Sequence, residues 1–125
     1  MSKSVRLVMA ALLALGALAG WSTTAAASEI REEITIPLTP DLSSSGRVEA
    51  RAAICFFTYA YGERALASVR CYGNGGAAGY FSVSAQCGDG SMVHSDPARY
   101  GSPITVSCPG SAGIRKLTVT LTTLR

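Results

Sequence analysis

The stretch LTVTLT at residues 117–122 alternates large apolar side chains with threonines over its whole length. Because successive side chains of a β-strand point to opposite faces, this stretch predicts a strand with one buried and one solvated face. The runs around Leu66, Phe81 and Ile104 alternate in a similar way, and valine and threonine suit half-buried strands. No window of residues 28–125 has a persuasive helical period, so this part of the chain is predicted to be all-β.

Turn sequences separate the predicted strands at intervals of roughly 8–12 residues. Asn74-Gly75, for example, supplies the positive φ angles that tight turns need. Pro37 lies inside the first run, which is expected at a sheet edge because proline cannot donate a ladder hydrogen bond. We interpret the longest run, residues 47–61, as one strand that becomes buried on both faces. The pattern predicts six to eight short strands in a small antiparallel β-sandwich, either immunoglobulin-like or a small barrel.

Residues 1–27 have the organisation of a secretory signal peptide. Lys3 and Arg6 precede an apolar stretch, residues 7–21, which is followed by small residues. As a helix this stretch would rise only about 22 Å, less than the ~30 Å of a hydrocarbon core. We therefore expect cleavage, no stable membrane insertion afterwards, and export of residues 28–125 as a single domain to the periplasm or the extracellular space.

The charge of that domain excludes one class of partner. The leader removes two of the 11 basic residues of the chain, which leaves nine against eight acidic ones. A nearly balanced charge gives no electrostatic footprint for nucleic acid. Apart from one lysine the basic residues of the domain are arginines, which suggests the codon usage of a GC-rich bacterium.

All four cysteines follow the leader, and an even number in a small exported domain indicates two disulfides. A turn centred near residue 63 places Cys55 opposite Cys71, because facing positions of a hairpin are equidistant from its turn. A loop centred near residue 99 likewise brings Cys87 close to Cys108. We therefore predict the pairs Cys55–Cys71 and Cys87–Cys108, each stapling the two strands of one hairpin.

Catalytic and metal-binding signals are sparse. His94 is the only histidine, so a Ser-His-Asp triad would have to use it, with Asp89 or Asp96 nearby in sequence. The chain has no G-x-S-x-G turn, no C-x-x-C motif and no evident pair of carboxylates. We therefore predict a protein that is not an enzyme and has no catalytic residue, metal or other cofactor. A small hydrolase is the alternative.

Aromatic and basic side chains form the main candidate for binding, because protein-binding hot spots are rich in both. Phe57, Tyr59 and Tyr61 share a strand face with Cys55, whereas Phe56 falls on the other face. The candidate binding residues are Phe57, Tyr59, Tyr61, Arg64, Arg70, Tyr72, Tyr80, Arg99 and Tyr100.

A second candidate is the proline-flanked loop 96–103, which contains Arg99 and Tyr100. A stiff exposed loop loses little entropy on binding and suits insertion into the cleft of a protease. The sequence thus predicts a secreted, non-catalytic protein that recognises a macromolecule, most simply an extracellular protein. A serine-protease inhibitor that uses this loop, and a module that binds polysaccharide or cell wall, are the alternatives.

Overall fold

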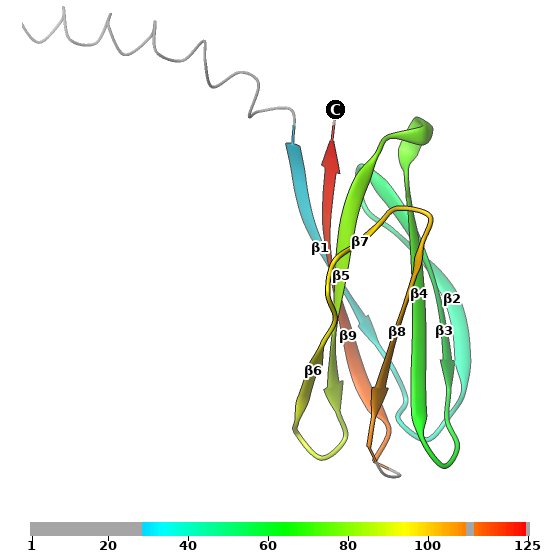
Figure 1. Ribbon diagram of the computed structural model, residues 1–125. Coiled ribbons are helices and arrows are strands. Elements are labelled where there is room, and N and C mark those ends of the chain that lie inside the picture. Colours follow the sequence, from blue (N-terminus) through cyan, green and yellow to red (C-terminus); the bar gives the residue numbers. More distant parts are fainter. Residues whose placement is uncertain (1–28, 110–111, 125) are drawn as a thin grey trace, which may run out of the picture.

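The computed structural model describes residues 29–109 and 112–124, so the predicted signal peptide lies outside the described part. The described chain is all-β, as predicted (Figure 1). Its strands are β1 (Glu29–Pro37), β2 (Ser44–Glu49), β3 (Ala53–Ala60), β4 (Ala65–Gly73), β5 (Gly79–Cys87), β6 (Met92–His94), β7 (Ala98–Arg99), β8 (Pro103–Cys108) and β9 (Ile114–Leu124). A short 3-10 turn, η2 (Asn74–Gly76), connects β4 to β5.

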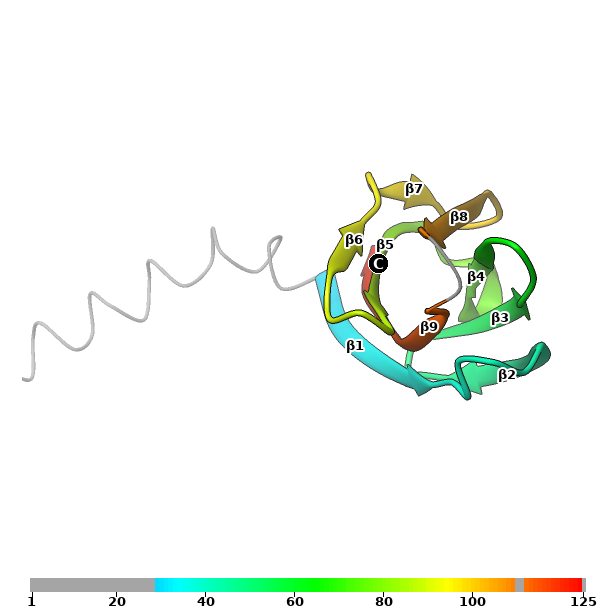
Figure 2. The same cartoon turned by 90° about the horizontal axis from the view of Figure 1, so that it is seen from below.

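The strands form two antiparallel sheets. One sheet has the order β1-β9-β5-β6, with the two-residue β7 also paired to β5, and the other has the order β2-β3-β4-β8. Seen end-on, the strands surround a single core, as expected for a small sandwich (Figure 2). Alternate residues of β4, β5 and β9 are buried there, among them Val69, Phe81 and Leu121. The strand that contains Pro37 lies at a sheet edge, as predicted.

The interpretation of residues 47–61 as one strand is wrong, because β2 and β3 form a hairpin that reverses at residues 50–52. This turn contains no glycine, proline or asparagine. It is held instead by Glu32 of β1, whose carboxylate accepts hydrogen bonds from the N–H groups of Arg51 (2.7 Å) and Ala52 (2.9 Å). A turn specified by a carboxylate on another strand leaves no signal in its own sequence.

Both disulfides have the predicted pairing, but they play different parts in the fold. Cys55–Cys71 joins the neighbouring strands β3 and β4, with a Cα–Cα distance of 4.1 Å. Cys87–Cys108 joins β5 to β8, which belong to different sheets, so the prediction of a second stapled hairpin is wrong. Two disulfides indicate an oxidising environment. No helix among the described residues is long and apolar enough to cross a bilayer.

Candidate binding surface

Three of the predicted binding residues belong to the interior. Tyr59 is only 1% exposed, and Phe57 and Tyr61 pack against the core. Tyr59 thus belongs to the core and Phe57 and Tyr61 are partly buried against it, so we do not include these rings in the surface described below. Their strand face also carries Cys55, whose disulfide is fully buried. The cysteine could have identified this face as the inner one.

Tyr59 has a structural role instead. Its hydroxyl donates a hydrogen bond to the carbonyl of Pro40 and accepts one from the N–H of Ile114 at 2.9 Å. One side chain thus connects β3, the segment that follows β1, and the start of β9. Buried polar groups are costly unless they are hydrogen-bonded, so this hydroxyl stabilises the junction.

The opposite face of β3 and β4 is exposed and carries a pair of aromatic rings. Phe56 is 44% exposed and Tyr72 is 40% exposed, and their rings meet edge to face with centroids 6.1 Å apart. Arg70 is the cross-strand partner of Phe56, and Pro103 of β8 is the partner of Arg70. Sequence reasoning placed Phe56 on this face but left it out of the binding residues. Its position opposite the cysteine face was the signal that could have included it.

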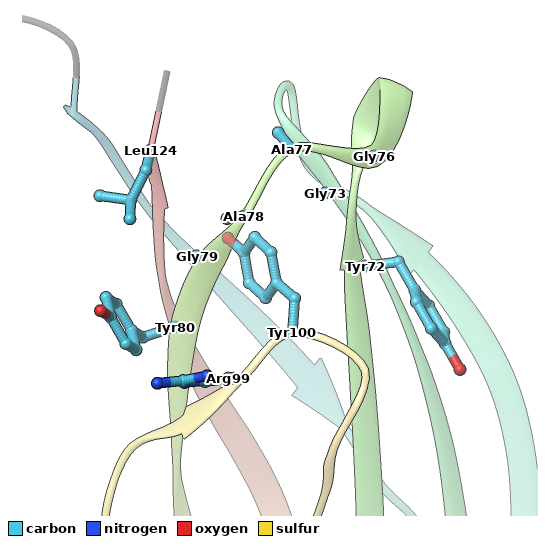
Figure 3. Close-up of a pocket in the computed structure, with 10 residues that line it drawn as sticks. All are labelled: Tyr72, Gly73, Gly76, Ala77, Ala78, Gly79, Tyr80, Arg99, Tyr100 and Leu124. Atoms are coloured by element: carbon cyan, nitrogen blue, oxygen red, sulfur yellow. The ribbon is translucent and has the colours of Figure 1, made fainter.

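Tyr72 also borders a hollow of about 380 Å³, which lies where β4 leads into β5 (Figure 3). The hollow brings together four predicted residues, Tyr72, Tyr80, Arg99 and Tyr100. The rest of its lining consists of small residues and one leucine: Gly73, Gly76, Ala77, Ala78, Gly79 and Leu124.

Tyr100 shapes this hollow from within. Its ring lies in the gap between β4 and β5 (Figure 3), with its centroid 6.4 Å from that of Phe81. Its hydroxyl is 2.7 Å from Oγ1 of the buried Thr123, and burial raises the pKa of Tyr100 above its usual value. A Cβ at Gly79 would come within 2.4 Å of this ring, so glycine is required there.

Tyr80 and Arg99 lie at the edge of the hollow as cross-strand partners on β5 and β7. Tyr80 is 45% exposed, Arg99 is exposed, and both side chains project to the same side (Figure 3). The ion pairs of the described residues lie on β1 and β2, so Arg99 and Arg70 have no carboxylate partner within the described chain. A separate depression beside Phe56 is lined by Phe56, Thr58, Ser68, Arg70, Tyr72 and Pro103. No acidic residue lines this depression or the hollow.

The hollow and the depression beside Phe56 adjoin at Tyr72, which borders both. The ring of Tyr72 projects from β4 on one side of the hollow, and Tyr80 and Arg99 project on the other side (Figure 3). We call the residues that border these two hollows the ring–arginine surface and define it by Phe56, Arg70, Tyr72, Tyr80 and Arg99. Another predicted residue, Arg64, is exposed but precedes β4 at the opposite end of that strand, away from this surface.

The segment 96–103 is not a free loop. Two of its residues form β7, which pairs with β5, and the N–H of Tyr100 donates to the carbonyl of Gly79 at 3.0 Å. Tyr100 is directed inward by these contacts, so Arg99 is the residue of the predicted inhibitory pair that remains exposed. The pairing with β5 restricts how far this segment could enter the cleft of a protease.

The only histidine gives no catalytic arrangement. His94 is exposed on β6, and its Nδ1 lies 2.8 Å from Oγ of Ser84 on the neighbouring strand β5. Asp89 instead accepts hydrogen bonds from Ser91, which lower the pKa of Asp89. No carboxylate bonded to His94 completes a triad within the described residues. They also contain no group of three side chains that could hold a metal ion.

Comparisons with known proteins do not assign the chain to a family. No protein-family model matches the chain, and no curated protein matches it. Among solved structures, the chain is similar to the enzymatically active domain of tailspike protein 4 of bacteriophage CBA120, with 8% identity and a TM-score of 0.22. The match covers 78% of this chain and 17% of the tailspike chain. A similarity this low carries no information about activity or substrate.

Proposed function

We propose that this protein is an exported, non-catalytic binding protein that uses the ring–arginine surface to recognise an acidic region of another exported protein. One observation supports this proposal above the others. Three exposed rings and two arginines without carboxylate partners in the described chain border two adjoining hollows, and no acid lines either hollow.

The chemistry of these side chains defines the partner. Exposed rings offer a large apolar contact area at a small entropic cost, which makes tyrosine common at the centre of protein interfaces. The guanidinium of arginine matches a carboxylate with two parallel hydrogen bonds. A complementary surface would therefore place carboxylates opposite Arg70 and Arg99, and apolar groups against the rings.

The surface is also rigid before it binds. Phe56 and Tyr72 stand on adjacent strands that the Cys55–Cys71 disulfide joins at the neighbouring position. Arg99 is held by the pairing of β7 with β5. Side chains on a fixed scaffold lose less freedom on association, so more of the contact energy remains as affinity.

Affinity capture with a matched pair of double variants tests the proposal. The oxidised protein would capture partners from the culture fluid and cell envelope of its source. The variant Phe56→Ser/Tyr72→Ser removes two exposed rings from the surface, and Leu66→Ser/Met92→Ser removes two comparably exposed apolar residues elsewhere. Loss of a central ring commonly weakens an interface by about 2 kcal/mol, or roughly 30-fold.

We expect the wild type and the Leu66/Met92 variant to retain the same acidic protein, and the Phe56/Tyr72 variant to lose it. Retention should fall as salt rises, because salt screens interactions between exposed charges. Equal capture by both double variants would contradict the proposed surface.

A further inference from the structure

We infer that the hollow is a subsite for a carboxylate that lies beside an apolar side chain, with the side chain inside the hollow and the carboxylate on Arg99. This inference rests on the proposed function, because it specifies what the partner presents. The carboxylate belongs either to the end of a chain or to an aspartate or glutamate next to an apolar residue.

The interior of the hollow favours an apolar group. The hydroxyl of Tyr100 already forms a hydrogen bond with Thr123. The part of Tyr100 that faces the hollow is therefore its apolar ring (Figure 3). The surrounding residues 76–79 are glycine or alanine, and Leu124 closes another side. The volume of about 380 Å³ is at the lower end of the range for small-ligand sites, so it suits a side chain rather than a large cofactor.

Two of the small residues around the hollow cannot be enlarged without moving the backbone. A Cβ at Gly73 would lie 2.2 Å from the carbonyl oxygen of Ala77, and a Cβ at Gly79 would lie 2.3 Å from that of Thr122. The backbone is therefore in close contact at two places on the rim. A ligand group enters a preformed space, which lowers the entropic cost of binding.

The charge at the rim favours an anion. Arg99 has no carboxylate partner within the described residues, and its cross-strand neighbour is Tyr80. The depression on the other side of Tyr80 contains Glu29, but this acid pairs with Arg31 at 3.5 Å. Arg99 is thus the charge available at the hollow, and a carboxylate is the anion that a protein partner offers.

Titration of the oxidised, isotope-labelled protein with three small peptides tests this inference by NMR. The probes are acetyl-Ala-Phe with a free carboxylate, the same peptide as its amide, and acetyl-Phe-Asp-amide. For fragments of this size we expect a Kd on the order of 1 mM. Binding of an acidic probe should shift the amide signals of Gly76, Gly79 and Tyr100, and the uncharged amide should bind about tenfold more weakly.

Two arginine variants identify the cation. Arg99→Gln should reduce the affinity for the acidic probes about tenfold, to the level of the uncharged amide. Arg64→Gln removes another exposed arginine, which precedes β4 at its far end, and should leave the affinity unchanged. Arg99→Lys keeps the charge without the planar fork and should recover part of the affinity. The stronger of the two acidic probes identifies the source of the carboxylate.

The inference is overturned if no probe shifts the signals of the hollow, if acid and amide bind equally, or if Arg99→Gln binds as the wild type does. None of these results contradicts the proposed function if the Phe56→Ser/Tyr72→Ser variant still loses its protein partner in the capture experiment. If the acidic probes bind through Arg99 while that double variant retains the partner, the subsite holds and the proposed binding surface fails.

Discussion

Glu32 on β1 holds Ala52, in the turn between β2 and β3 of the other sheet, through a hydrogen bond of 2.9 Å from the Ala52 N–H to Oε1. The other carboxylate oxygen accepts from the N–H of Arg51. Asn74 completes the arrangement, since its side-chain amide donates to the carbonyl of Arg51 and its own N–H donates to the carbonyl of Ala52. A turn without turn residues is thus built by two polar side chains about twenty positions away along the chain.

Glu32→Ala is expected to destabilise the protein by about 1–3 kcal/mol, because two backbone donors lose their acceptor. Glu33→Ala provides the control, since Glu33 is the next residue along β1 and is exposed. Its loss should change the free energy of unfolding by less than about 0.5 kcal/mol. Urea denaturation of both variants measures the difference, and equal destabilisation would show that the Glu32 contact contributes little.

Tyr59→Phe is expected to lower the free energy of unfolding by about 1–3 kcal/mol, since the N–H of Ile114 and the carbonyl of Pro40 both lose their partner. For a domain of this size the change corresponds to a fall in Tm of roughly 4–8 °C per kcal/mol. Tyr72→Phe removes an exposed hydroxyl and should leave Tm unchanged. A thermal scan that gave the same Tm for Tyr59→Phe and the wild type would refute the role assigned to Tyr59.

Removal of the two disulfides should have different effects on local opening. The closed loops have similar sequence separations of 16 and 21 residues, so each bridge should contribute about 3 kcal/mol in the chain-entropy model. Replacing Cys55 and Cys71 by alanine should increase amide exchange mainly within β3 and β4. Replacing Cys87 and Cys108 should increase it in both sheets. Hydrogen exchange distinguishes the two patterns, and identical patterns would argue against an inter-sheet role for Cys87–Cys108.

Stability should depend on Tyr100 at alkaline pH. Burial raises the pKa of the Tyr100 hydroxyl above the ordinary 10.0. The protonated hydroxyl therefore contributes its full stability below the unfolded pKa, and that contribution is lost as the pH rises past about 10 and through the higher folded value. Tyr100→Phe should be less stable at neutral pH, because Thr123 loses its partner, but should lose less stability between about pH 9 and pH 11. Denaturation across this range checks the slope, and parallel curves would contradict the expectation.

The sequence predicted where the strands lie better than it predicted which strands pair with one another in the sheets. Alternation at residues 117–122 identifies a strand and its two faces, because it follows from the pleat itself. It does not say which sheet the strand joins. The turn positions were enough to pair Cys87 with Cys108, but they also placed both cysteines in one hairpin. That placement fails because β8 pairs with β4 in the other sheet.

The candidate site shows the same limit. Residue type alone was enough to name Arg70, Tyr72, Tyr80 and Arg99 as candidates, since rings and arginines are common at binding surfaces. Residue type could not distinguish the buried Tyr59 from the exposed Tyr72. A tyrosine can be a binding residue at the surface or a core residue whose hydroxyl bonds to the backbone. Only the fold brings the end of β4, the start of β5 and β7 around one hollow.

The position of the Cys87–Cys108 bridge makes the two ends of the sandwich chemically different. Cys87 closes β5 and Cys108 closes β8, so the covalent link lies at the end of these strands away from the hollow. At the hollow the sheets are joined by weaker contacts, in which the N–H groups of Tyr100 and Gly101 donate to the carbonyls of Gly79 and Cys71. The two sheets are therefore held covalently at the end of β5 and β8 that carries the bridge and non-covalently at the end that carries the hollow, so reduction of this disulfide would remove the covalent link between the sheets.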